Sequence, residues 1–145
     1  DETLTPHLAE LSAGSFLSVS SPVQTLDASA FPGILVIAGG SAVTVALQLC
    51  EAVLRRHPKR GRAHLVLCNR TADDVLLRDR LDALLGRCPG FHLVHCLSEA
   101  PPPRGASSSG RPAWRRGHLD AGALAGVEPR LKAVVSGPPG LCSAA

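Results

Sequence analysis

The chain has 145 residues, of which 45% are hydrophobic and 19% are charged. This composition suits one globular domain with its own core and excludes both a disordered chain and a complete two-domain enzyme. The formal net charge is +3, and every apolar run is well short of the roughly 20 residues of a membrane-spanning helix. The first six residues lack a basic region before an apolar stretch. The sequence therefore predicts neither a signal peptide nor direct membrane insertion.

Residues 1–33 differ in pattern from the rest of the chain. Residues 16–20 alternate between apolar and polar side chains, as an exposed strand does. The stretch 22–32 begins and ends with proline and is typical of a linker. We interpret this region as the end of one domain and its connection to the next.

From residue 34 onward, strand-like and helix-like stretches alternate. The sequence predicts strands over 34–38, 63–68, 91–97 and 133–135, and helices over 43–54, 73–87 and 119–125. The stretch 101–112 is rich in Pro, Gly and Ser and is predicted to be an exposed loop. The first helix carries an apolar stripe of Val43, Ala46, Leu47, Cys50, Val53 and Leu54. Repeated strand–helix–strand units predict an α/β fold with a parallel sheet and helices on both of its faces.

The loops that follow the predicted strands form the candidate ligand site, because open parallel sheets bind ligands beyond the carboxyl ends of their strands. These loops are 39–41, 68–71, 98–99 and 136–139. Gly39 and Gly40 permit a sharp turn before a helix, whose N-terminal amide groups accommodate phosphate oxygens. A tight turn in which Ser41 caps the helix explains these residues equally well. A ligand crevice requires this turn to meet the turn at Pro138 and Pro139.

Three further features receive structural interpretations. Arg55 and Arg56 fall in the last turn of a helix, where the helix dipole stabilises cations, and the chain has too few aromatic residues to favour nucleic-acid binding. The five cysteines form no Cys-x-x-Cys pair, so we expect reduced thiols. His92 and His95 would point to opposite faces of a strand, so we expect no metal site there.

Three segments, 38–45, 69–78 and 136–139, resemble in order and context the ferredoxin-reductase-like flavoproteins, and most of all the cytochrome b5 reductases. Residues 4–11 and 16–22 resemble the end of the flavin domain of that family. The sequence of residues 18–22 is most similar to that of the subgroup that is fused to a cytochrome b5 and a CS domain. The resemblance implies that residues 1–33 are the remnant of an FAD-binding β-barrel domain plus a linker. It also implies that 34–145 form an NAD(P)H-binding domain, incomplete at its C-terminus, in a chain truncated at both ends.

In this family, hydride passes from the nicotinamide to FAD, and electrons then pass to a haem protein. The resemblance implies that Thr44 and Ser136 act beside the flavin and the nicotinamide as the catalytic positions. The cofactor-binding residues that it implies are Thr5, Gly39, Gly40, Ser41, Thr44, Asn69, Ser98, Gly137 and Pro138. Thr5 would lie near the flavin pyrophosphate, 39–41 near the dinucleotide pyrophosphate, and 137–138 at the nicotinamide.

The sequence departs from the family pattern at three positions. Ala42 replaces a glycine of the phosphate loop, Val45 replaces a proline, and Ser136 replaces a common cysteine. These departures motivate an alternative hypothesis, a degenerate module that has lost its cofactor and acts as an interaction or scaffold domain. A third hypothesis is an unrelated nucleotide-binding domain that shares only the alternation of strands and helices.

The end of the third strand is expected to set cofactor preference. Ser98 stands where NADH-selective relatives have Asp and would permit a 2′-phosphate, whereas Glu99 would repel it where an Arg would hold it. We therefore predict NADH, with relaxed selectivity against NADPH.

The resemblance also implies a parent protein of which this chain is a part. That parent would be an NAD(P)H:cytochrome b5 reductase-type oxidoreductase, and this chain alone would be inactive. Its partners would be NAD(P)H, the FAD domain and a haem protein such as cytochrome b5. Its location would be the cytoplasmic side of the cell, in association with the endoplasmic reticulum.

Overall fold

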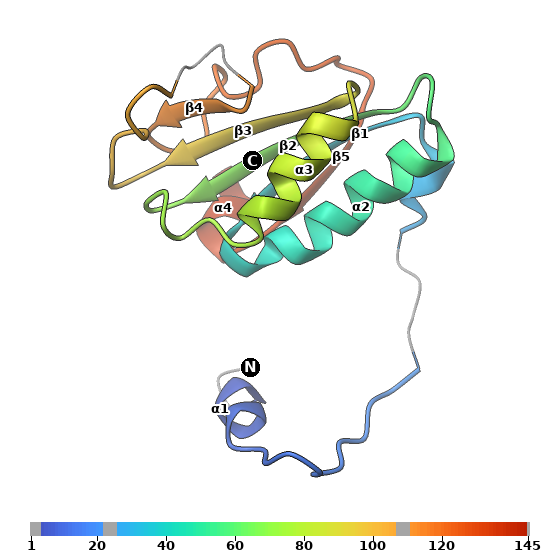
Figure 1. Ribbon diagram of the computed structural model, residues 1–145, viewed down its shortest axis with the longest axis vertical. Coiled ribbons are helices and arrows are strands. Elements are labelled where there is room, and N and C mark those ends of the chain that lie inside the picture. The colour runs from blue at the N-terminus through green and yellow to red at the C-terminus, as the bar shows by residue number, and fades with distance from the viewer. Residues whose placement is uncertain (1–3, 22–25, 107–110, 145) are drawn as a thin grey trace.

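The computed structural model describes residues 4–21, 26–106 and 111–144 of the chain, and a five-stranded sheet forms its centre (Figure 1). The strands are β1 (Gly33–Gly39), β2 (Arg62–Asn69), β3 (Phe91–Leu97), β4 (Ala113–Arg116) and β5 (Lys132–Ser136). They are ordered β4-β3-β2-β1-β5, and every neighbouring pair is parallel. The predicted α/β class with a parallel sheet is therefore confirmed.

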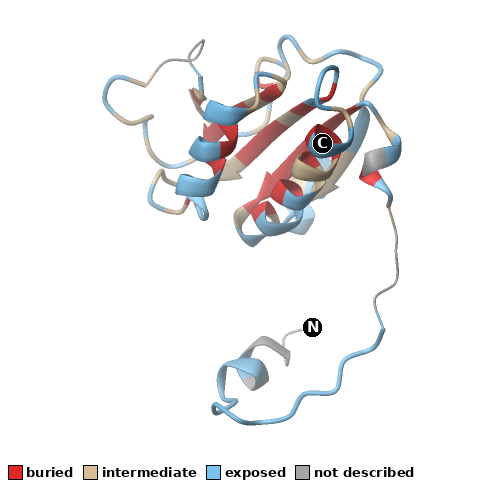
Figure 2. Cartoon of the chain, turned by 45° about the vertical axis from the view of Figure 1, so that its right-hand side comes forward, coloured by how far each residue is buried: buried red, intermediate tan, exposed pale blue. Residues whose placement is uncertain are grey.

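Two helices, α2 (Val43–Arg56) and α3 (Arg78–Arg87), cover one face of the sheet (Figure 1). Helix α2 buries all six residues of the predicted apolar stripe, and its last turn contains Arg55 and Arg56 as expected. Helix α3 buries Leu81, Leu84 and Leu85. Their apolar side chains join those of the strands in the larger core cluster. Figure 2 shows that the buried segments are concentrated in the central strands and in the helices that cover them.

The opposite face carries a smaller core cluster. Leu35, Ile37 and Cys96 of the sheet meet Ala123 there, and Leu141 of helix α4 (Pro139–Ala144) packs against them. The helix predicted over 119–125 is wrong, because residues 121–126 form successive turns. In these turns each amide bonds to a carbonyl three residues earlier, and the Asp120 carboxylate also accepts a 2.8 Å bond from the Ala123 amide. Such side-chain competition for backbone amides favours turns over a helix.

Helix α3 begins five residues later than the sequence predicts. The amide and the hydroxyl of Thr71 donate hydrogen bonds of 3.0 and 2.9 Å to the Asp74 carboxylate, which holds this segment in a turn. Leu77 then adopts a left-handed conformation with φ of 57° immediately before the helix. This local geometry prevents the helical pattern of 73–77 from forming.

The N-terminal region contains short helices rather than a strand. Helix α1 (Leu4–Ala9) and the 3₁₀ turn η1 (Ala28–Ala30) are its regular elements among the described residues. The strand predicted over 16–20 is wrong, since this stretch is irregular and exposed, and Phe16 is 100% exposed. An alternating pattern without a neighbouring strand has no partner for its backbone groups.

The edge strand β4 was not predicted. Its Trp114 is buried and stacks on His95 of β3, with ring centroids 4.0 Å apart. Just before β4, the Nη2 atom of Arg111 donates hydrogen bonds to the carbonyls of Leu85, Cys88 and Phe91 at 3.1, 2.9 and 2.9 Å. The arginine thus ties the start of β4 to the end of α3 and the start of β3.

None of the helices in the described part of the chain is both long and apolar enough to cross a membrane.

Candidate functional site

The order of the strands places a crevice at one edge of the sheet. Strands β2, β3 and β4 follow β1 on one side, whereas β5 returns to the other side of β1. The loops after β1 and β5 therefore leave the sheet where its winding direction changes. Open α/β sheets bind ligands at such a switch point.

The turns after β1 and β5 are in direct contact. A methyl group placed on Gly137 would lie 3.1 Å from the backbone nitrogen of Gly39. A methyl group on Gly39 would lie 3.1 Å from Cδ of Pro138 and 2.9 Å from a methyl of Leu141. The diglycine turn and the diproline turn converge, as the ligand hypothesis requires.

Two hollows border this contact. The smaller, of about 590 Å³, is lined by Gly39, Gly40, Ser41, Ala42, Thr44, Val45, Ser136, Gly137 and Pro138. The larger, of about 690 Å³, shares Gly39, Gly40 and Pro138 with it and extends past Asn69 and Ser98 to Gly117, His118 and Leu119. Each volume lies in the range of small-molecule sites. Together the two hollows form what we call the switch-point crevice.

The backbone at the diglycine turn leads directly into α2. Gly40 has φ of 57°, a left-handed conformation that glycine adopts readily, and it is the first residue of the 3₁₀ turn η2 (Gly40–Ala42). Neither η2 nor α2 has a side-chain cap, so the interpretation in which Ser41 caps the helix is wrong. The Thr44 hydroxyl donates a 2.9 Å hydrogen bond to the Ser41 carbonyl. The first turn of α2 therefore carries amide groups without a side-chain acceptor.

Asn69, which lines the larger hollow, has a buried polar atom without a partner. The Nδ2 atom of Asn69 is buried and makes no hydrogen bond to any described residue. Its backbone is fixed, because the Asn69 carbonyl accepts a 3.0 Å bond from the Ser98 amide. A buried donor left unpaired costs about 1–3 kcal/mol. A ligand that brought an acceptor into the hollow would satisfy this donor once the side-chain amide of Asn69 turned toward it.

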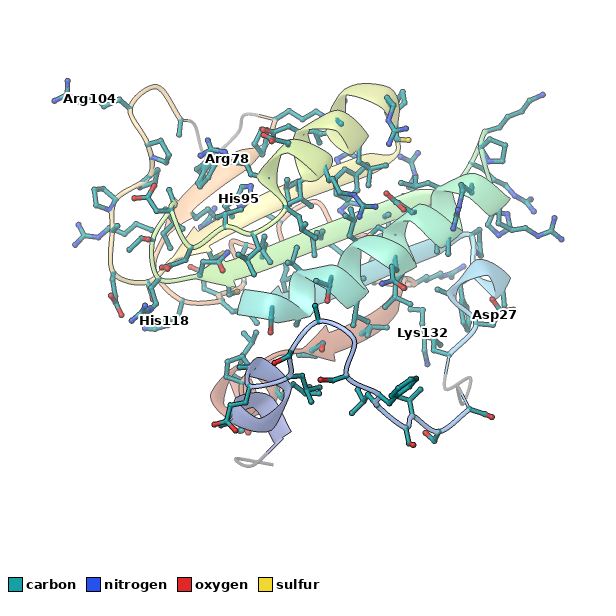
Figure 3. The ribbon with its side chains drawn as sticks, turned by 60° about the horizontal axis from the view of Figure 1, so that its bottom comes forward. Asp27, Arg78, His95, Arg104, His118 and Lys132 are labelled. Carbon is teal, nitrogen blue, oxygen red and sulfur yellow. The ribbon has the colours of Figure 1, made fainter. Side chains whose placement is uncertain are left out.

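The charge lining the larger hollow is mixed. Arg70 and His118 contribute cationic or ionisable groups, and Asp73 and Asp74 contribute carboxylates. Hydrogen bonds from the Thr71 hydroxyl and amide, assisted by Arg70 at 3.9 Å, hold the pKa of Asp74 below its usual value. In Figure 3, His118 lies at the end of the sheet toward which the strands point, and Lys132 lies at the opposite end.

The residues at which this sequence departs from the reductase pattern also line the crevice. Ala42 has φ of −61°, an ordinary helical value that requires no glycine. Val45 is 49% exposed on the first turn of α2, and Ser136 faces the smaller hollow. These side chains border the crevice without filling it.

The structure brings together eight of the nine predicted cofactor-binding residues. Gly39, Gly40, Ser41, Thr44, Gly137 and Pro138 line the smaller hollow with Ser136, and Asn69 and Ser98 line the larger one. The side chain of Thr5 lies outside the described residues. Glu99, which was expected to influence cofactor choice, is exposed and does not line either hollow.

Several lining residues were missed from the sequence. His118 and Leu119 follow the unpredicted strand β4, and Leu141 lies on the unpredicted helix α4. Nothing in the local sequence pattern marks these residues. Arg70 lies in the predicted ligand-site loop 68–71, although it was not named as a binding residue.

The predicted separation of His92 and His95 on β3 is confirmed. His95 stacks on Trp114 at the face covered by α3, whereas His92 stacks on His64 with ring centroids 4.5 Å apart and borders a hollow at the other face.

This parallel sheet, with a diglycine turn and a crevice at its switch point, defines a dinucleotide-binding type of α/β domain. Residues 36–145 match the family of oxidoreductase NAD-binding domains. The chain belongs to this family, and the family predicted from the sequence is confirmed.

Known proteins similar to this chain agree with the assignment. Over 97% of its length it is 31% identical to NADH-cytochrome b5 reductase 1 of Ajellomyces capsulatus, of which it covers 46%. The cytochrome b5 reductase domain of Ulva prolifera nitrate reductase superposes with a TM-score of 0.63 at 26% identity, covering 77% of this chain and 40% of that one. The CS-b5R domains of human Ncb5or, in the NAD⁺ form, superpose with a TM-score of 0.76 at 22% identity, over 97% of this chain and 40% of that one.

The similarity to human Ncb5or, at 22% identity, concerns the fold alone. Membership of the subgroup with a CS domain therefore stays a prediction. The chain spans about half the length of the curated relatives it matches.

Proposed function

We propose that the switch-point crevice binds NAD(H) and that this chain is the dinucleotide-binding part of a flavoprotein reductase. The observation that carries the proposal is the direct contact between the Gly39 and Gly137 turns, with a hollow on each side. A dinucleotide has two nucleosides joined by a pyrophosphate, and this arrangement offers a place to each. The phosphate groups would meet the uncapped first turn of α2.

The lining residues divide between the two ends of the dinucleotide. Asn69 and Ser98 would bind the adenosine end, with the unpaired Nδ2 of Asn69 as a donor. Gly39, Gly40 and Ser41 would line the pyrophosphate. The nicotinamide would occupy the smaller hollow.

Thr44 and Ser136 would orient the nicotinamide ring. The Thr44 hydroxyl donates its hydrogen bond to the Ser41 carbonyl, so the lone pairs of its oxygen are free to accept a hydrogen bond from the carboxamide. Gly137 and Pro138 would shape the wall against which the ring packs. When bound, the cofactor supplies the hydride, and these residues supply its orientation.

In the parent protein, we propose, the acceptor of this hydride is FAD and the electrons then pass to a haem protein such as cytochrome b5. Residues 1–33 would belong to the FAD-binding domain and its linker, with Thr5 near the flavin pyrophosphate, and 34–145 to the NAD(P)H-binding domain. The parent would work on the cytoplasmic side, in association with the endoplasmic reticulum. We favour membership of the subgroup fused to a cytochrome b5 and a CS domain, because the sequence of residues 18–22 is most similar to it.

The scaffold alternative has lost its motivation. It rested on Ala42, Val45 and Ser136, yet these residues border an open crevice instead of closing it.

Titration of the ¹⁵N-labelled chain with NAD⁺, followed by NMR, tests the proposal. We expect saturable changes in the amide signals of Gly39, Gly40, Asn69, Ser98 and Gly137. ADP-ribose, which lacks the nicotinamide, should shift Asn69 and Ser98 but leave Ser136 unchanged. Changes centred on His64 and His92, or shifts that never saturate, would contradict the proposed site.

A further inference from the structure

Two cysteines lie side by side beneath the larger hollow. Cys68 of β2 and Cys96 of β3 are direct partners in the register of these parallel strands. Both line the hollow, and both pack with the core cluster on the same face of the sheet. Cys96 is 1% exposed, whereas Cys68 is only partly buried.

The thiols interact with each other. The Cys96 thiol donates a hydrogen bond to the Cys68 sulfur, which lowers the pKa of Cys68 in spite of its partial burial. The same bond, together with burial, raises the pKa of Cys96. By contrast, burial raises the pKa of Cys50 to about 12. Cys68 is the more exposed thiol of the pair and also the one whose pKa is lowered, so it is the one that acts as the nucleophile.

We propose that Cys68 and Cys96 form an oxidisable dithiol that a hydroperoxide converts into a disulfide joining β2 to β3 under the crevice. This site does not depend on nucleotide binding. It adds a reversible covalent modification to a chain whose five cysteines are all free thiols in this structure.

The reaction proceeds in two steps. The Cys68 thiolate attacks one peroxide oxygen, so that an S–O bond forms and the O–O bond breaks, leaving a sulfenic acid and hydroxide. The Cys96 sulfur then attacks the Cys68 sulfur, an S–S bond forms and the S–O bond breaks. In sum, two thiols and one hydrogen peroxide give one disulfide and two waters. The two sulfurs lose two electrons, and the peroxide gains them.

The strand geometry permits this bond. Neighbouring strands lie about 4.7–4.9 Å apart, and disulfides join residues whose Cα atoms are about 4.4–6.8 Å apart. Registered residues of parallel strands project their side chains to the same side. The Cβ atoms of a disulfide lie about 3.5–4.5 Å apart, so the bond requires rotation of both side chains and a local approach of the two strands by a few tenths of an ångström.

The test treats the purified chain with hydrogen peroxide, blocks the remaining thiols by alkylation and maps the peptides by mass spectrometry. Combined trypsin and chymotrypsin digestion separates Cys88 from Cys96 at Phe91. We expect a linked peptide containing Cys68 and Cys96, with the mass of two hydrogens lost, that disappears under a reductant. Links formed mainly by Cys88 or Cys142, or over-oxidation of Cys68 without any link, would overturn the proposal.

Variants separate the two steps. In Cys96→Ala, Cys68 should stop at the sulfenic acid, which a dimedone probe labels, while Cys142→Ser should form the link as the unmodified chain does. Because Cys96 is buried, circular dichroism must show that Cys96→Ala is folded, and the partly exposed Cys68→Ser provides a second variant that should give no link. Label on Cys142 alone in folded Cys96→Ala would also overturn the proposal.

Adding NAD⁺ before the peroxide tests the dithiol and the proposed nucleotide site separately. This experiment is the only one of the set that rests on the proposed function. Bound nucleotide should cover Cys68 and slow the formation of the link severalfold. A link that forms at the same rate with saturating NAD⁺ supports the dithiol and contradicts the nucleotide position. Failure of the link both with and without NAD⁺ rejects the dithiol alone.

Discussion

Replacing Gly40 by alanine should separate binding from stability. Gly40 has φ of 57°, and a methyl group there would have no heavy atom within 4 Å. The substitution therefore adds no clash within the chain and costs only the left-handed conformation, about 1 kcal/mol. For a domain of this size, that corresponds to a fall in Tm of about 3 °C. The methyl group would nevertheless enter the space shared by both hollows.

We expect NAD⁺ affinity to fall at least about tenfold in Gly40→Ala, which corresponds to about 1.4 kcal/mol. Calorimetric titration and thermal melting measure the two effects. Gly126→Ala is the matched control, since Gly126 has φ of 81° and equally open surroundings but borders a hollow away from the switch-point crevice. It should lose the same stability and keep full affinity. Unchanged affinity in Gly40→Ala, or equal losses of affinity in both variants, would refute the reasoning.

Two further predictions concern cofactor choice and pH. The affinities of the chain for NADH and NADPH should lie within about tenfold of each other, and Ser98→Asp should lower the affinity for NADPH alone by about tenfold through charge repulsion. Titration with both nucleotides measures these affinities. A strong NADPH preference of the unmodified chain would contradict the prediction. Burial and nearby Arg78 lower the pKa of His95 from 6.5 to about 4. Between pH 6.5 and pH 4 the imidazole is therefore protonated in the unfolded chain but neutral in the folded chain, so the stability of the fold decreases as the pH falls. The decrease in Tm from pH 7 to pH 5 should be smaller in His95→Phe, and equal decreases would exclude His95 as a contributor.

The central strands and the first helix could be predicted because their burial patterns are simple. All seven residues of β1 are buried, so a continuous apolar run marks it. Strand β3 occupies the predicted residues 91–97. In α2, every residue of the predicted stripe is buried. The convergence of the Gly39 and Gly137 turns followed from the parallel order of these strands.

The remaining elements depend on contacts that no local pattern records. Strand β4 has only four residues, and it exists because Trp114 stacks on His95 and β3 offers an edge. The late start of α3 depends on the bond between Thr71 and Asp74. His118 and Leu141 reach the crevice from such elements. They were therefore missed, although the glycines and Ser98 beside them were found.

The anchoring of Arg111 bears on how this domain can diversify. One guanidinium group fixes the chain at the start of β4, and the residues after β4, including Gly117 and His118, form a wall of the crevice. Residues 101–106, the described part of the loop before the anchor, lie on the other side of Arg111 from that wall and line neither hollow of the crevice. We therefore expect the crevice to tolerate changes of length before Arg111 better than a substitution of Arg111 itself, which would remove the three hydrogen bonds that fix the start of β4.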